Sequence, residues 1–180
     1  MITKPIGSAI RTYTGQLFDF VNPEASPISI EDIAHALSLL CRFAGHCKEF
    51  YSVAEHSYRV SYVCPPEHAL WGLMHDASEA YCVDVPRPLK HMPNMEHYRA
   101  HEKRVQRAIC GWFNMDPVEP PEVKAADMVL LVTEQRDLLR NSIPDFSIKP
   151  LETVIAPLSA YRAEQLFLAR FHHLTQNRKF

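Results

Sequence analysis

Apolar side chains recur every three or four residues from Ser29 onward, which is the spacing of one face of an α-helix. Two stretches, SIED at 29–32 and SVAE at 52–55, are capping boxes, in which a serine and a carboxylate three residues later satisfy free amides of the first turn. Helices are therefore expected to begin at Ser29 and at Ser52. Their apolar faces carry Ile30, Ile33, Ala34, Leu37, Leu40 and Cys41 in the first, and Val53, Val60 and Val63 in the second.

Prolines divide the rest of the chain. Pro65 and Pro66 end the second helix and open a third, over 66–81, because proline suits the first turn of a helix but not its interior. The apolar side of this third helix consists of Ala69, Leu70, Leu73, Met74, Ala77 and Tyr81. Three prolines predict a loop over 83–93. Further helices are expected at 95–113, 121–140 and 157–175.

Residues 1–28 lack this helical period and hold at most a short strand pair around Thr12 to Phe20. Strand signals are few elsewhere, so the pattern predicts an all-α fold, a compact helical bundle forming one domain over 1–180. The expected division is an irregular lead-in at 1–28, a helical core at 29–140 and a C-terminal helix within 141–180.

Length and charge limit the possible partners. A chain of 180 residues with 47% hydrophobic content can bury roughly 70% of its unfolded surface. The formal net charge is only -2, which provides no field for holding a nucleic-acid backbone or an anionic membrane. Polymeric nucleic acid and membranes are therefore not expected partners.

The lengths of the apolar runs and the spacing of the cysteines bear on cellular location and on disulfide formation. No apolar run approaches the roughly 18 residues of a membrane span, and the N-terminus has no apolar signal core. The five cysteines form no C-x-x-C pair, so we expect reduced thiols and a cytoplasmic protein.

Polar side chains occupy the apolar faces of three predicted helices. His56 falls between apolar neighbours three residues before it and four after it, so it points inward. His75 and Asp76 interrupt the apolar face of the next helix, and Asp127 is bracketed by apolar positions on the helix at 121–140. Taken alone, each is more often a hydrogen-bonded core residue than a ligand.

A metal ion explains these residues together. A buried, ionised carboxylate costs several kcal/mol unless it is paired, and no arginine on the same face is spaced to neutralise both Asp76 and Asp127. One divalent cation compensates both, with two neutral imidazoles completing the ligand set. Mixed nitrogen and oxygen ligands without thiolate suit an open ion such as Mn²⁺, Co²⁺, Fe²⁺ or Mg²⁺ better than a closed structural Zn²⁺ site.

Three motifs carry a resemblance to a known family. AEHS, HDASEAYCVDVPRPLK and VKAAD together resemble the HD-domain phosphohydrolase superfamily, and within it the YfbR-like 5′-deoxynucleotidases and the phage dATP triphosphohydrolases. The similarity extends from about Arg42 to Asp127. It implies an HD-domain bundle with a catalytic core, in which His56, His75, Asp76 and Asp127 hold one catalytic divalent metal. Zn²⁺ remains among the candidate ions, and a second ion accompanying the substrate phosphates is left open.

The resemblance also implies roles for acidic residues beside these ligands. Glu79 matches the acid that handles protons around the attacking water. Asp84, in VDVPRP, matches a catalytic-site residue that meets the sugar 3′-hydroxyl. Relatives commonly carry glycine where this chain has Val83, which leaves the loop conformation to be determined.

Four further positions match substrate-binding residues. Arg42 corresponds to an arginine that binds phosphate, and Phe43 falls where some relatives pack a tryptophan against the deoxyribose. Lys90 and Lys124 correspond to lysines that contact phosphate oxygens, although both also fit as solvated surface residues.

The reaction itself is left with alternatives. No glycine-rich phosphate loop, H-E-x-x-H or G-x-S-x-G occurs, which sets aside other nucleotide-binding and hydrolase architectures. The first expectation is a phage-type dNTP triphosphohydrolase, preferring dATP and releasing deoxynucleoside and triphosphate. A dNMP 5′-nucleotidase is the alternative, and a non-catalytic nucleotide sensor belongs to a different class. The implied partners are a small deoxynucleotide and further copies of the chain in a dimer or larger homo-oligomer, in the host cytoplasm for a phage-type protein.

Overall fold

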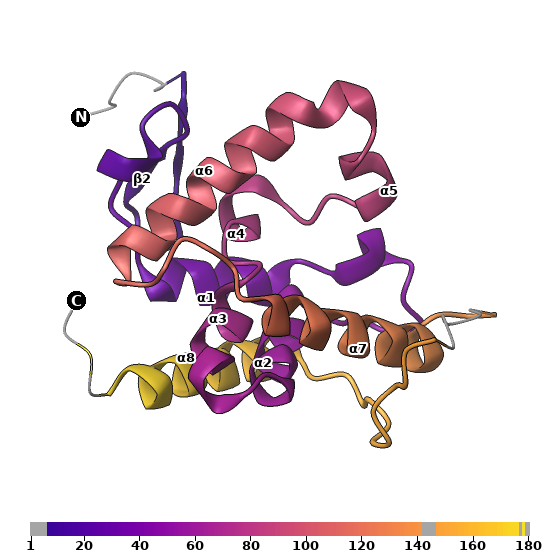
Figure 1. Ribbon diagram of the computed structural model, residues 1–180. Coiled ribbons are helices and arrows are strands. Elements are labelled where there is room, and N and C mark those ends of the chain that lie inside the picture. Colours follow the sequence, from indigo (N-terminus) through magenta and orange to yellow (C-terminus); the bar gives the residue numbers. More distant parts are fainter. Residues whose placement is uncertain (1–6, 142–146, 177, 179–180) are drawn as a thin grey trace.

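The chain folds into a bundle of helices with a small β-hairpin at one side (Figure 1). The computed structural model describes residues 7–141, 147–176 and 178. Its strands are β1 (Ala9–Arg11) and β2 (Leu17–Asp19), which pair antiparallel. Its α-helices are α1 (Ile30–Leu39), α2 (Val53–Val63), α3 (Ala69–Met74), α4 (Glu79–Cys82), α5 (Arg87–Lys90), α6 (Glu96–Trp112), α7 (Pro121–Leu138) and α8 (Ala160–Thr175). Short 3-10 turns are η1 (Pro23–Ala25), η2 (Arg42–Gly45), η3 (Pro66–His68) and η4 (Pro93–Met95). The mostly helical prediction is confirmed.

Serine caps begin two of the helices, as predicted. Ser29 accepts a hydrogen bond from the backbone of Asp32, and Ser52 accepts one from the backbone of Glu55. The reciprocal half of each capping box is not formed. The Asp32 carboxylate instead accepts two hydrogen bonds from Thr14, and the Glu55 carboxylate turns toward other partners. Each acid therefore ties its helix to a distant segment.

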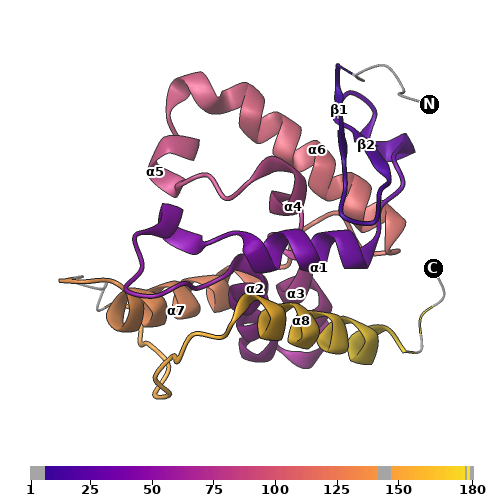
Figure 2. The ribbon, with the colours of Figure 1, turned by 180° about the vertical axis from the view of Figure 1, so that it is seen from behind.

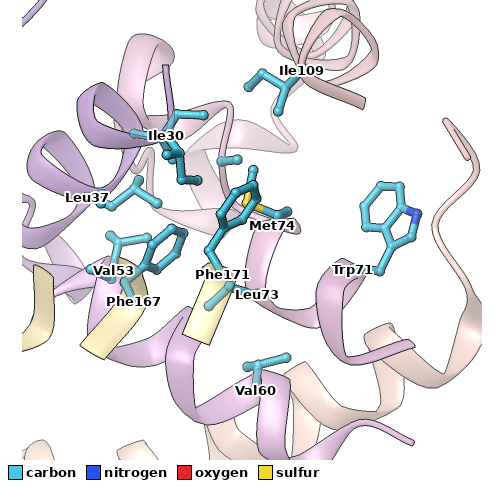
Figure 3. Packing of buried hydrophobic residues seen from close by; sticks show 14 of the residues in the cluster. Ile30, Leu37, Val53, Val60, Trp71, Leu73, Met74, Ile109, Phe167 and Phe171 are labelled. Atoms are coloured by element: carbon cyan, nitrogen blue, oxygen red, sulfur yellow. The ribbon is translucent and has the colours of Figure 1, made fainter. Parts of the chain in front are cut away.

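The core lies around α2, which packs against α1, α3, α7 and α8. Leu37, Val53, Leu73 and Phe167, one from each of α1, α2, α3 and α8, are fully buried there (Figure 3). Burying each such side chain contributes about 1.5–3 kcal/mol. Figure 2 shows α1 and α8 on the same face of the bundle. Helix α2 is thereby surrounded by four other helices.

Gly72 lets α3 approach α2 closely. A Cβ atom at this position would lie 2.5 Å from the Sγ of Cys64, just after α2, and 3.2 Å from the Cα of Ser61. Any larger side chain would push the two helices apart. This contact sets the position of the end of α3, where His75 and Asp76 follow.

The predicted helix over 66–81 is wrong in one respect, because it breaks after Met74 and resumes at Glu79. Gln106, on α6, supplies the hydrogen bonds that a continuous helix would have provided. Its side chain donates to the carbonyl of Met74 at 2.8 Å and accepts from the amide of Ser78 at 3.0 Å. The apolar face predicted across the break remains buried, including Ala77.

Other predicted bounds shift by a few residues. The loop expected over 83–93 contains the one-turn helix α5, and the strand pair lies somewhat earlier than Thr12 to Phe20, joining Ala9 to Asp19. The five cysteines are free thiols. Parts of the lead-in and of the C-terminal region, 1–6, 142–146, 177 and 179–180, lie outside the described residues. Within the described chain, every helix is too short or too polar to cross a membrane.

Candidate metal centre

Three side chains predicted as metal ligands present their donor atoms to one point. Donor atoms of His56, on α2, and of His75 and Asp76, just after α3, all lie within 4.8 Å of one another. The two Nε2 atoms are 3.3 Å apart, and Oδ2 of Asp76 is 3.2 Å from His75 and 3.6 Å from His56. Ligands bound at about 2.1 Å to one ion are about 3.0–3.4 Å from their neighbours. The group can therefore hold a metal ion.

Asp127, the fourth predicted ligand, approaches from α7. Its Oδ1 lies 3.4 Å from Nε2 of His56, and its Oδ2 accepts a hydrogen bond from Lys124 one turn earlier. Asp127 thus borders the centre on the side of His56, and the lysine binds its other carboxylate oxygen.

The outer nitrogen of each histidine is occupied. Nδ1 of His75 lies 2.8 Å from the carbonyl oxygen of Gly72, and Nδ1 of His56 lies 2.6 Å from Oε1 of Glu134. A carbonyl can only accept, so Nδ1 of His75 carries a proton, and Nε2 is the nitrogen that can bind a metal ion. Histidines that bind metals commonly make such outer hydrogen bonds, and the donor set fits a divalent ion.

Both carboxylates of the centre stay ionised. Burial raises the pKa of Asp76, but His75, His56 and Arg42 outweigh it and hold the pKa well below its ordinary value. For Asp127, His56, His75 and Lys124 outweigh burial in the same way. Conversely, burial lowers the pKa of His75, yet the two aspartates raise it to about 9. The protein therefore concentrates negative charge that favours a cation at this point.

Glu134, on α7, is a residue that the sequence reasoning missed. It is fully buried, and its Oε2 accepts hydrogen bonds from Nε and Nη2 of Arg42 at 3.2 and 3.0 Å. Arg42 and His56 are 92 and 78 residues away in the chain, so no local spacing links them to it. The available signal was its position two helical turns after Asp127, on the same face of α7.

A cavity of about 790 Å³ adjoins the centre. Its walls come from η2, the α4–α5 segment and α7, and the views show η2 between α5 and α7 (Figures 1 and 2). Asp76, Asp127 and Glu79 line it, and the two histidines lie buried beside it. The predicted substrate-binding residues also line it: Arg42, Phe43, Asp84, Lys90 and Lys124.

Glu79 is buried in the wall of this cavity. One oxygen, Oε1, lies 3.5 Å from Nζ of Lys90, while Oε2 has no hydrogen-bond partner among the described residues. Burial, with the nearby charges of Asp76 and Asp84, raises the pKa of Glu79 well above its ordinary value. Lys90 binds Glu102 more closely, at 2.8 Å, so it is already paired within the protein.

Two strained backbone segments shape the cavity. Phe43 and Ala44 adopt left-handed φ angles of 54° and 51°, followed by Gly45 at 81°. Val83 has φ 68° and ψ 153°, a conformation essentially restricted to glycine. Val83 therefore holds a conformation that glycine would adopt without strain. Asp84, next to it, lines the cavity.

Two proteins with similar sequences, both described as uncharacterized, show what this chain is related to. No protein-family model matches the chain. It is 39% identical to the uncharacterized protein YfdR of Escherichia coli K12 over 180 residues, covering 96% of this chain and 98% of YfdR. It is 32% identical to an uncharacterized protein of Rhodobacter capsulatus over 125 residues, covering 64% of this chain and 63% of that protein. The chain therefore belongs to the same protein family as Escherichia coli YfdR.

Proposed function

We propose that this protein is an HD-type, metal-dependent phosphohydrolase of 2′-deoxynucleotides. The observation that carries the proposal is the convergence of the donor atoms of His56, His75 and Asp76 beside a cavity of about 790 Å³. Binding sites for small molecules usually have volumes of about 300–1,000 Å³, so a nucleotide fits this size class. The resemblance of the motifs around these ligands supplies the reaction type.

His56, His75, Asp76 and Asp127 are the residues that would hold the metal. A bound divalent ion would supply Lewis acidity toward a phosphoryl oxygen and lower the pKa of water. Glu79 would carry the proton at Oε2, the oxygen with no protein partner among the described residues. Its raised pKa favours the protonated form, from which the side chain can donate a proton.

The sugar would lie against Asp84 and Phe43, which both line the cavity. Asp84 offers carboxylate oxygens to a sugar hydroxyl, and the ring of Phe43 offers an apolar surface to the deoxyribose. The guanidinium carbon of Arg42 lies 5.4 Å from the centre of that ring, which helps to hold the ring at the cavity wall.

The cationic side chains that line the cavity affect how many phosphate groups a substrate could carry. Arg42, Lys90 and Lys124 are each paired with carboxylates of the protein. Arg87 instead contacts the sulfur of Met128 at 3.4 Å and has no carboxylate partner within the described part of the chain. We assign Arg87 as a further phosphate ligand at the rim.

The first candidate reaction is hydrolysis of a dNTP, with dATP preferred, to deoxynucleoside and triphosphate. The pairing of three of the cavity's cations favours a substrate with less charge, so removal of orthophosphate from a dNMP is the second candidate. Both reactions use the same metal centre and the same proton carrier.

Chelation tests the proposal. Protein stripped of divalent ions should release no phosphate or triphosphate from deoxynucleotides, and added Mn²⁺ or Co²⁺ should restore the release. Full hydrolysis by the chelated protein would contradict a metal-dependent mechanism.

A further inference from the structure

We propose that Glu134 is a positioning residue of the metal centre, which holds His56 with its proton on Nδ1 and so turns the Nε2 lone pair toward the other ligands. The inference rests on the metal centre proposed above. Glu134 does not line the cavity, so its role differs from that of a residue in contact with substrate.

The geometry leaves Glu134 little freedom. Its side chain is fully buried, with Oε1 2.6 Å from Nδ1 of His56 and Oε2 bound by Nε and Nη2 of Arg42. An ionised carboxylate can only accept hydrogen bonds, so Nδ1 of His56 must donate. The short distance is typical of a charge-assisted hydrogen bond, which fixes the plane of the imidazole ring.

Arg42 offsets the desolvation cost of the buried Glu134 carboxylate and also approaches a second metal ligand. Two of its nitrogens bind Glu134, and the third, Nη1, lies 3.6 Å from Oδ2 of Asp76. The planar guanidinium therefore joins Glu134 to Asp76, while Glu134 itself joins His56. One buried pair thus braces two ligands that come from different segments of the chain.

Glu55, on α2, provides a matched comparison. It is also fully buried, and its Oε1 accepts from Nε and Nη2 of Arg59 at 2.9 and 2.6 Å, while its Oε2 accepts from the amide of Leu158 at 2.8 Å. The burial and the arginine pairing are the same as those of Glu134. Two differences remain. The third partner of the Glu55 carboxylate is a backbone amide in place of a metal ligand, and Arg59 approaches the carbonyl of Ala156 where Arg42 approaches Asp76.

The two glutamates define the experiment. Co²⁺ binding to the full chain is measured by titration calorimetry, and thermal unfolding by circular dichroism, for wild type, Glu134→Gln and Glu55→Gln. Glutamine offers one acceptor and one donor group, so at position 134 it cannot accept from both His56 and Arg42. We expect Glu134→Gln to weaken Co²⁺ binding about 10- to 100-fold. Glu55→Gln should lower the melting temperature but leave the Co²⁺ affinity unchanged.

Wild-type affinity in a folded Glu134→Gln variant would overturn the inference, as would equal losses of affinity in both variants. If glutamine at position 134 prevents folding, Glu134→Asp and Glu55→Asp replace the pair. The aspartate keeps the charge but is shorter by one methylene, so only Glu134→Asp should weaken binding. A wild-type protein that does not bind Co²⁺ overturns the metal centre and this inference together. One that binds Co²⁺ without hydrolysing deoxynucleotides overturns the proposed reaction alone.

Discussion

The Nε2 atoms of His56 and His75 lie 3.3 Å apart, although the two residues belong to different segments of the bundle. Each ring uses Nδ1 for an outer hydrogen bond, to Glu134 or to Gly72, so the two Nε2 atoms are left to face each other. Two nitrogens this close need a proton or a metal cation between them. A divalent ion should therefore stabilise the folded protein.

Substitution of His75 tests this expectation. Co²⁺ at a hundredfold excess over its dissociation constant should raise the free energy of unfolding by about 2.7 kcal/mol in the wild type. His75→Ala should lose this gain and bind Co²⁺ at least about 100-fold more weakly, because loss of a direct ligand costs more than loss of an outer contact. His68→Ala, which removes a histidine paired with Glu122, should keep the Co²⁺-dependent gain. Thermal unfolding with and without Co²⁺ measures the gain in stability for each variant.

Glu79→Gln should separate metal binding from turnover. The residue contacts Lys90 and is absent from the group of donor atoms, so Co²⁺ affinity should persist while the rate of hydrolysis falls about 10²- to 10⁴-fold. Glu102→Gln is the control, because Glu102 also binds Lys90 but does not line the cavity. A Glu79→Gln enzyme as fast as the control would remove Glu79 from the mechanism.

Val83→Gly should stabilise the protein. The φ and ψ angles of Val83, 68° and 153°, cost a side chain about 1–3 kcal/mol, whereas glycine adds an entropy cost of about 0.5–1 kcal/mol. We expect the free energy of unfolding in urea to rise by about 1 kcal/mol. Val118→Gly, at an exposed valine outside the positive-φ residues, should instead lower it. Equal losses in both variants would show that Val83 is unstrained.

Asp137 should make stability depend on pH. It accepts hydrogen bonds from Arg136 at 2.7 and 2.9 Å and from the amide of Ile155 at 2.8 Å. The hydrogen bonds from Arg136 lower the pKa of Asp137, burial raises it, and the hydrogen bond from Ile155 lowers it. The net effect is a pKa below the ordinary value. A carboxylate whose pKa is lowered by folding stabilises the protein above its unfolded pKa of about 3.9 and loses this effect as the pH falls through the folded pKa.

Asp137→Asn should therefore lower the free energy of unfolding by about 1–2 kcal/mol at neutral pH, since Arg136 is partly exposed to solvent. The difference from wild type should shrink as the pH falls below about 4. Urea denaturation of both proteins across this range provides the measurement. A difference that is the same at both ends of the range would exclude the ionised carboxylate as its source.

Much of the fold was predictable because it depends on local spacing. The caps at Ser29 and Ser52 and the inward position of His56 all follow from residues within one or two turns. The helix break after Met74 was not predictable, because Gln106 supplies the missing backbone partners from another helix. The periodic apolar pattern runs through the break without a gap.

The candidate site divides in the same way. Residues that interrupt an apolar face stand out in a sequence, and His75 and Asp127 were predicted on that basis. Glu134 also interrupts an apolar face, between Leu130 and Leu138, but its partners Arg42 and His56 are reached only through the fold. Arg42 lines the cavity and also binds Glu134, and local spacing could not predict this pairing either.

The central claim is metal-dependent hydrolysis of deoxynucleotides, and a substrate panel tests it most directly. The protein is incubated with each common dNMP and dNTP in Mn²⁺ or Co²⁺, and the products are separated into deoxynucleoside, orthophosphate and triphosphate. We predict release of deoxynucleoside from at least one substrate, with triphosphate from dATP as the first expectation and orthophosphate from a dNMP as the second, and no release by His75→Ala. Failure of a Co²⁺-binding protein to release deoxynucleoside from any of these substrates would contradict the proposal.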